Sequence, residues 1–362
     1  MKQAVLSTCL RFLTIGLVSL CLWACYPVSQ VSYSVPQEAS VNQWLIEFKT
    51  TEAKAHLTMR YRRVRDTGFS ENSTGIGISL DQFVGLTREQ VMSSGSAVQF
   101  QLKRDAGTFN FEGWFKDGNG SGHFTFSPNA SFASDLTRQG FGNATSEQMM
   151  SLAMADVGMV FINELRTQGY DTSTVDQLVR MANHGVRLEY LRGLKSIGFT
   201  VKSTDLVVKM IDHGVNLGFI QELNEIGYTG LSPEELIRAR DHGVSSSFIR
   251  GFVAAGYERS SLDGWIKLMD HGVSVKFVSE LKELGYEKVS LEDLRMMKDH
   301  GVSAAFIQEL KDLGYSNLPI DQLIRMQDHG VSASYIKKMK ERGYTDLSID
   351  EYIRMRDRGT SD

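Results

Sequence analysis

Histidine recurs at a fixed interval through the second half of this 362-residue chain. Six of the eight histidines are evenly spaced, at His184, His213, His242, His271, His300 and His329. A period of about 20 to 50 residues is typical of repeat architectures, in which each unit buries its apolar face against the next. The interval therefore predicts a stack of similar units over this part of the chain.

Two other columns keep the same period and begin earlier in the chain. Glycine followed by an aromatic residue recurs from Gly140 to Gly343, and a second aromatic column runs from Phe132 to Tyr335. We therefore expect the repeat array to begin with half a unit at Phe132 and to occupy residues 131–362.

The residues within one unit predict two short helices joined by a turn. Ser232 is a favoured helix N-cap, and Pro233 suits the first helical position. Gly243 suits the left-handed residue that ends a helix, Ser245 caps a second helix, and Gly256 ends it. Helices of about ten residues are marginal alone, so neighbouring units have to bury a shared face. The unit predicts an α-solenoid of 29-residue helix-turn-helix repeats.

Each of the six histidines falls in the last turn of a predicted first helix. Packed helices lie roughly 8–10 Å apart, whereas a zinc ligand lies about 2 Å from its ion. Histidines one unit apart are therefore too distant to share a metal, and we predict neither a metal nor a cofactor. We interpret the six as structural residues that complement the helix end. A metal-lined groove and a pH-sensitive role are the alternatives.

Charged residues also follow the period. Basic side chains stand at Arg180, Lys209, Arg238, Lys267, Arg325 and Arg354. An aspartate, or Asn183 in the first case, follows each one three residues later, so five ion pairs within single helices are expected. The chain has 39 Lys plus Arg against 43 Asp plus Glu. Because each base has an acid nearby and the balance is acidic, we predict no nucleic-acid partner.

One unit departs from the others in its second helix. It carries Phe252 and Val253, the second of these where other units have polar residues, and Trp265 follows in the next helix. These three residues are a candidate contact patch on the surface. The alternative interpretation is a thicker piece of the core.

Residues 41–130 show the alternation typical of half-buried β strands. Apolar residues occupy every second position in three segments, at Trp44, Ile46 and Phe48, at Leu57, Met59 and Tyr61, and at Val98, Phe100 and Leu102. Asp117-Gly118 predicts a hairpin turn, and Thr87 to Gln90 predicts a capping box for one short helix. The predicted fold class is α+β multidomain, with an N-terminal antiparallel β-rich domain followed by the α-solenoid.

Residues 1–25 have the layout of a secretory signal peptide. Lys2 and Arg11 precede an uncharged stretch from Phe12 to Cys25, which is shorter than the roughly 20 residues that span a bilayer. Leu22-Trp23-Ala24-Cys25 resembles a bacterial lipobox, so Cys25 is the candidate lipidation site. A secreted protein and a retained N-terminal anchor are the alternatives. Residues 26–40, with two prolines and several serines, predict a tether.

Motifs of catalysis are lacking in the sequence. It contains no His-Glu-x-x-His, no Gly-x-Ser-x-Gly and no phosphate-binding Gly-rich loop. All three cysteines lie in the leader, which excludes a disulfide framework from the rest of the chain. We therefore predict that the protein is not an enzyme, with a hydrolase as a remote alternative.

Three blocks carry a resemblance to a known family: Val98 to Phe109, Gly122 to Pro128, and the Asp-His-Gly-Val repeats. Over residues 41–362 the chain resembles the C-terminal, extracytoplasmic region of bacterial antirepressor-type membrane zinc metallopeptidases of the β-lactam-sensor kind. Those relatives owe their peptidase assignment to a His-Glu-x-x-His motif in a multi-span membrane domain, and this sequence has neither. The resemblance implies a sensing or scaffolding module, without the peptidase domain and with no catalytic residue carried over.

Together these features predict a non-catalytic, extracytoplasmic protein of the bacterial cell envelope, held at the membrane by a lipid or an N-terminal anchor. Its repeat array is expected to bind another protein or an envelope component. The chief alternative is a regulatory sensor that receives a small ligand in the β-rich domain. The sequence leaves the identity of the partner and the oligomeric state open.

Overall fold

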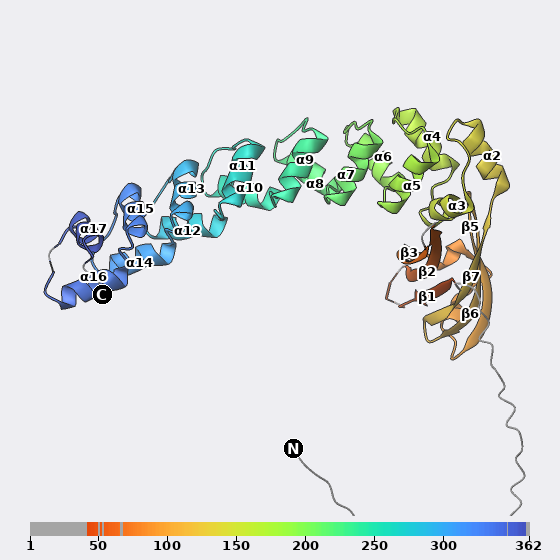
Figure 1. Cartoon of the computed structure of the whole chain (residues 1–362), viewed down its shortest axis with the longest axis horizontal. Coiled ribbons are helices and arrows are strands. Elements are labelled where there is room, and N and C mark those ends of the chain that lie inside the picture. The colour runs from red at the N-terminus through yellow and green to blue at the C-terminus, as the bar shows by residue number, and fades with distance from the viewer. Residues whose placement is uncertain (1–41, 50, 53, 66–67, 346, 360–362) are drawn as a thin grey trace, which may run out of the picture. The chain divides into compact units, whose positions relative to one another are not determined.

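The computed structural model describes residues 42–359 except 50, 53, 66–67 and 346 (Figure 1). The predicted signal peptide with Cys25 and the predicted tether at 26–40 lie outside the described residues. The described part consists of an antiparallel sheet followed by helices, which is the α+β layout expected from the sequence.

Seven strands in the described residues form one antiparallel sheet, in the order β3-β2-β1-β7-β6-β5-β4. Their bounds are β1 Gln43–Glu47, β2 Ala55–Arg65, β3 Gly68–Ile78, β4 Phe83–Val84, β5 Ser96–Arg104, β6 Gly107–Lys116 and β7 Asn119–Pro128. Two short helices, η1 (Leu80–Gln82) and α1 (Arg88–Val91), interrupt the strand sequence. The three alternating segments predicted as strands are confirmed in β1, β2 and β5.

Trp44 is central to the apolar face of this sheet. It is buried, and its ring centroid lies 5.3 Å from that of Phe100 in an edge-on arrangement. Its Nε1 donates to the backbone carbonyls of Glu112 and His123, both at 3.1 Å. A Cβ atom added to Gly113 would lie 2.7 Å from the indole, so a side chain there would displace the ring. The glycine therefore makes room for the tryptophan.

Two predictions of local structure in this region are confirmed. Asp117 and Gly118 join β6 to β7 with φ angles of 49° and 82°, the positive values that a two-residue hairpin turn requires. At α1, the Thr87 side chain accepts from the Gln90 backbone amide, and the Gln90 side chain accepts from the Thr87 amide. This reciprocal pair is the predicted capping box.

Helices follow the sheet in an alternating series, and the start points within each series keep the period of the histidines without exception. The first helices are α3 (Ser146–Met154), α5 (Val175–Asn183), α7 (Thr204–Asp212), α9 (Pro233–Asp241), α11 (Leu262–Asp270), α13 (Leu291–Asp299), α15 (Ile320–Asp328) and α17 (Ile349–Asp357). The second helices are α2 (Ala130–Arg138), α4 (Met159–Gln168), α6 (Leu188–Ser196), α8 (Leu217–Glu225), α10 (Ser246–Ala254), α12 (Val275–Glu283), α14 (Ala304–Asp312) and α16 (Ala333–Glu341).

The helix ends follow the predicted residues. Ser232 and Glu235 form a reciprocal capping box at the start of α9. Gly243, just beyond the end of α9, has a φ of 74°, and Ser245 caps α10 through the Phe248 amide.

No helix among the described residues has both the length and the apolar character needed to cross a membrane.

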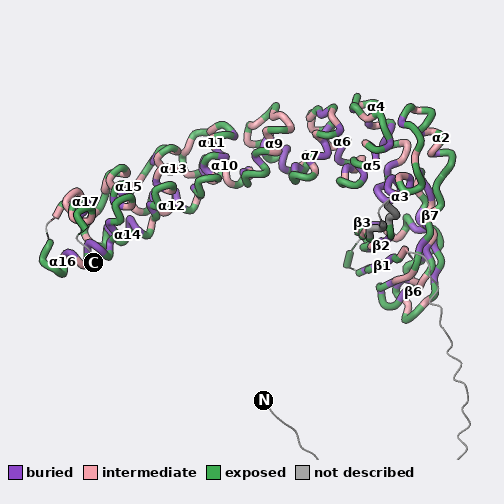
Figure 2. Tube along the Cα trace, viewed as in Figure 1, coloured by how far each residue is buried: buried purple, intermediate pink, exposed green. Residues whose placement is uncertain are grey.

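Neighbouring units share a core rather than standing alone. Each first helix from α5 to α15 contacts the next first helix along the chain, and α6 to α14 contact the next second helix in the same way. Buried residues accordingly recur along the helical series (Figure 2). Short helices are stabilised here by their packing against the next unit, as their length requires.

Residues at the turn between β5 and β6 bind the helical part of the chain through hydrogen bonds and an ion pair. The Asp105 side chain accepts from the backbone amide of Met159, at the start of α4, at 2.8 Å. Asn129 donates to the Asp105 carbonyl at 2.9 Å, and Arg104 pairs with Asp156 at 3.2 Å. A Cβ atom on Gly158 would lie only 2.4 Å from the Asp105 carboxylate, so this close approach depends on glycine.

Candidate functional site

The six repeat histidines form a ladder of contacts between units. Nδ1 of each histidine lies against Oδ1 of the aspartate 28 residues later, at 2.6–2.7 Å in five of the pairs. The pairs are His184–Asp212, His213–Asp241, His242–Asp270, His271–Asp299, His300–Asp328 and His329–Asp357. We call this set the His–Asp ladder. The histidine side chains are 37–42% exposed.

The ladder corrects the predicted ion pairs within single helices. Aspartates such as Asp241 contact the histidine of the preceding unit instead of the base three residues earlier. The arginines reach forward to the next first helix, in the pairs Arg180–Asp205, Arg238–Asp263 and Arg325–Asp350. The i,i+3 rule failed because it considers one helix alone, whereas stacking places a closer partner on the neighbouring helix.

Departures from the repeat show that histidine and aspartate occur as a pair. One unit before His184 the corresponding position is Ala155, and the position that would pair with it holds Asn183 instead of aspartate. At the other end His329 has its partner Asp357, although Arg358 stands where the next histidine would be. Each of the six histidines thus has an aspartate 28 residues later, and the unit without the histidine also lacks the aspartate. This is expected if the two residues serve the contact between them.

The candidate contact patch does not hold together as a surface. Phe252 and Trp265 are both fully buried, with ring centroids 5.3 Å apart, and Trp265 Nε1 donates to the Tyr228 hydroxyl. Val253, by contrast, is 45% exposed. Two of the three residues therefore thicken the core, the interpretation that the sequence left as the alternative, and Val253 alone faces solvent.

The first helices present an outer edge on which charged residues recur, and we call it the first-helix ridge. Besides the His–Asp ladder it carries an acid near each helix start from α5 onward: Asp176, Asp205, Glu234, Asp263, Glu292, Asp321 and Asp350. Several of these acids accept from the basic residue of the preceding unit. Asp205, Asp263 and Asp350 are therefore paired with a base of the preceding unit, and Glu292 is paired with Arg295 of its own helix.

The second helices present a different edge, the second-helix ridge. At one exposed position, the successive second helices from α6 to α16 carry Arg192, Gln221, Arg250, Ser279, Gln308 and Lys337, and we call this set the exposed column. Ion pairs along it are irregular, such as Arg192–Glu164 at 2.9 Å and Arg250–Glu225 at 3.1 Å. Hydrogen bonds from Arg192 and Gln168 lower the pKa of Glu164 below its ordinary value. The residue in this column differs between neighbouring units, whereas the His–Asp contact recurs along the first-helix ridge.

The sheet offers a second kind of surface on the side opposite its apolar face. One cross-strand row runs through Gln99, Glu112, His123, Gln43, Arg60 and Ser73, from β5 to β3. All six are exposed. The adjacent row contains Ala97, Trp114, Ser121, Leu45 and Thr58. We call the two rows the polar row and the tryptophan row.

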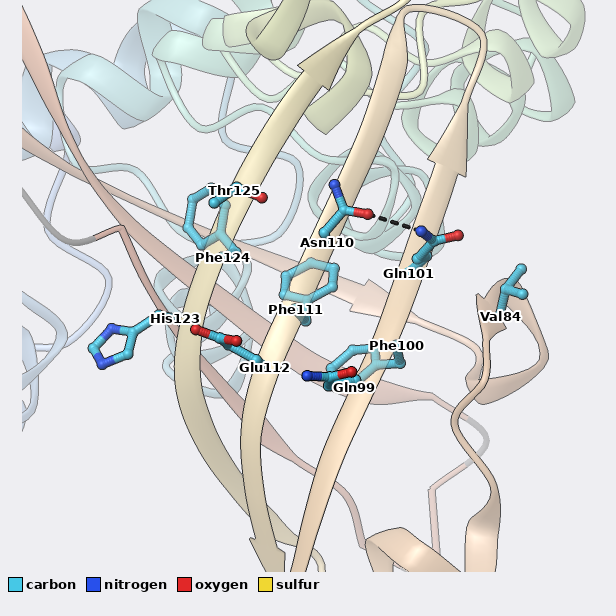
Figure 3. A pocket seen from close by; sticks show the side chains of 10 residues that line it. All are labelled: Val84, Gln99, Phe100, Gln101, Asn110, Phe111, Glu112, His123, Phe124 and Thr125. Atoms are coloured by element: carbon cyan, nitrogen blue, oxygen red, sulfur yellow. Dashed lines mark hydrogen bonds between the residues drawn. The ribbon is translucent and has the colours of Figure 1, made fainter.

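Two hollows lie on this outer face and meet at His123. The first, of about 440 Å³, is lined by residues of β5, β6 and β7 and by Val84 of β4, and Figure 3 shows its polar groups, including Gln101 and Asn110. Gln101 Nε2 donates to Asn110 Oδ1 at 2.8 Å. The second hollow, of about 420 Å³, lies over Trp114 and Arg60. Together they form a furrow across the middle of the sheet.

Sequence reasoning missed this furrow and the His–Asp ladder. The ladder had a signal in the chain, because Ala155 and Asn183 depart from the repeat together. The furrow had a weaker one, since Trp114 falls on the polar side of the alternation in β6. Its extension to Gln43 and Arg60 depends on β1 lying between β7 and β2, a strand order that the sequence did not provide.

Within the described residues, no three His, Cys, Asp or Glu side chains gather in a group that could hold a metal ion. Comparison of the chain with protein-family models, with curated proteins and with solved structures finds no match.

Proposed function

We propose that this chain is a non-catalytic protein of the bacterial cell envelope whose helices form an α-solenoid that binds a partner protein along the second-helix ridge. One observation carries the proposal. The first-helix ridge repeats the His–Asp contact in unit after unit, whereas the exposed column of the second-helix ridge, from Arg192 to Lys337, changes its residue between neighbouring units.

Positions that repeat in each unit and positions that differ between units are expected to serve different roles, the first in stacking and the second in binding. A position that makes the same contact in each unit serves stacking, as His213 and Asp241 do. A position that is exposed and free of such a contact can differ, and its side chains are available to a partner. Repeat arrays commonly bind through an extended surface of this kind.

The composition of the second-helix ridge suits a protein partner. Near its middle, Val253 is exposed beside Arg250, with polar residues along the neighbouring helices. Protein interfaces combine an apolar centre with a polar rim, and arginine is enriched in them. A long, shallow and mixed surface offers little to a small molecule, which requires a concave site.

The envelope location rests on the leader and on Cys25, and the resemblance to extracytoplasmic modules of sensor peptidases points the same way. Replacing Cys25 with Ser in the full chain is expected to release the protein from membranes. Unchanged fractionation would count against lipidation at this residue.

Site-specific photo-crosslinking in the full chain tests the binding role. A photoreactive amino acid at position 253 is expected to give one discrete protein adduct in cells, while the same group at Glu234, on the first-helix ridge, gives none. Arg250→Glu introduced beside it should abolish the adduct, because it reverses the charge next to the contact. Adducts of equal yield at both positions, or an adduct indifferent to Arg250→Glu, would refute the proposal.

A further inference from the structure

We propose that the outer face of the sheet binds a neutral saccharide, with Trp114 as the surface on which a sugar ring stacks. This site lies on other strands and residues than the second-helix ridge, so it is independent of the array's proposed role. Three features of the furrow indicate a neutral saccharide as the ligand: its shape, its hydrogen-bonding groups and its charge.

The shape of the furrow is that of a ligand site. Each hollow, at about 440 and 420 Å³, falls in the range of roughly 300–1,000 Å³ found for small-ligand pockets. Trp114 is 51% exposed because its cross-strand neighbours, Ala97 and Ser121, are too small to cover the indole. A single exposed apolar residue is ordinary on a protein surface, but this one lines a hollow together with Arg60 and His123.

The hydrogen-bonding groups suit hydroxyls. The amides of Gln99, Gln101 and Asn110 both donate and accept, and the Glu112 carboxylate accepts. A sugar presents several hydroxyls, each of which also donates and accepts. The bond between Gln101 and Asn110 holds these two amides in place in the absence of a ligand, which lowers the entropy lost on binding.

The two rows match the two aspects of a sugar ring. The tryptophan row places the apolar side chains of Trp114 and Leu45, which is 41% exposed, beside the polar row. A pyranose has an apolar face of C–H groups and a polar edge of hydroxyls. Stacked on the indole, a ring would present its edge to Glu112 and His123, in the next row of the sheet.

The charges of the furrow favour a neutral ligand. Glu112 contributes a negative charge and Arg60 a positive one, and they lie in the same cross-strand row with His123 and Gln43 between them. An anionic ligand would meet the carboxylate, and a cationic one would meet the guanidinium. The groups that remain are amides and hydroxyls, which recognise uncharged polar groups.

An extended peptide fits this face less well. Peptides commonly join a sheet by adding a strand at its edge, where backbone groups are unpaired. Most of the furrow lies over β6, β7, β1 and β2, each of which is paired on both sides, and only its margin reaches the edge strand β4 at Val84. Over those four strands only side chains are available to a ligand.

Titration of the full chain with uncharged oligosaccharides tests the proposal. The probes are hexamers of N-acetylglucosamine and of glucose, followed by calorimetry and tryptophan fluorescence. At least one hexamer is expected to bind and to change the fluorescence of Trp114. Trp114→Ala should weaken binding by roughly tenfold or more, the effect of losing one aromatic contact, and Glu112→Gln should weaken it by removing a charged acceptor.

Matched variants keep the result specific. Tyr344→Ala removes another exposed aromatic residue, on the helical array, and Glu47→Gln neutralises another exposed acid, on β1 outside both hollows. Neither should change the affinity. Failure of both hexamers to bind at millimolar concentration would overturn the proposal, as would unchanged affinity in Trp114→Ala. Tighter binding of an uncharged Ser/Thr decapeptide at the same residues would assign the furrow to peptides instead.

Discussion

The contacts that stabilise the sheet and those that stabilise the helical array span different distances along the chain. In the sheet, β1 lies between β2 and β7, so Trp44 reaches the His123 carbonyl 79 residues away. In the array, the repeated polar contacts span about one unit, such as the 28 residues from His213 to Asp241. The sheet is therefore expected to unfold as a whole, whereas an array of nearest-neighbour contacts can lose structure unit by unit.

The largest effect that would sharpen this contrast is expected at Trp44. Trp44→Ala removes the buried indole with its contacts to Phe100 and Phe115 and its two hydrogen bonds. Because Gly113 and Gly122 have no side chains to refill the space, the loss should be about 3–5 kcal/mol in the free energy of unfolding. Urea unfolding of the full chain, followed by hydrogen exchange, should show protection lost throughout the sheet.

The matched variant in the array is Trp265→Ala. Trp265 is also fully buried, and it contacts Phe248 and Phe252. Its removal is expected to expose the units around α10 and α11 while protection at α15 to α17 remains. Equal loss across the whole array would show that the array unfolds as one cooperative body, which contradicts unit-by-unit unfolding.

A smaller effect is expected on alkaline titration of the array. Burial raises the pKa of Tyr170 to about 12 and also raises that of Tyr190. The unfolded chain binds these protons less tightly, with a pKa of about 10. Their contribution to stability is therefore intact below pH 10 and is lost as the pH rises toward 12. Thermal melts at about pH 9 and 11 should differ less in Tyr170→Phe than in the parent, and equal differences would contradict this.

The smallest effect concerns one rung of the His–Asp ladder. A double-mutant cycle with His213→Ala and Asp241→Ala should give a coupling of about 0.2–1 kcal/mol, because both side chains are about two-fifths exposed and solvent weakens the contact. Asn183→Asp provides the control. Ala155 stands where its histidine would be, so the new carboxylate should add no stability.

Local features were predictable from the sequence, and features that join distant segments were not. Caps such as Ser232 and Thr87, and the Asp117-Gly118 turn, depend on residues within four positions, so their chemistry determines the structure directly. The partner of Asp241 was assigned wrongly because it lies on another helix. The furrow depends on strand order, and its position between β5 and β2 emerges only when the register aligns the polar row.

The His–Asp ladder also makes the length of the array adjustable in whole steps. Each unit contributes one aspartate that faces backward and one histidine that faces forward, as Asp241 and His242 do. Removing residues 213–241 would join Asp212 to His242, and each remaining histidine would still have an aspartate at the same spacing. Duplication or loss of a unit in the gene thus leaves each ladder histidine with an aspartate. The array can therefore become longer or shorter while the contacts between its units stay the same.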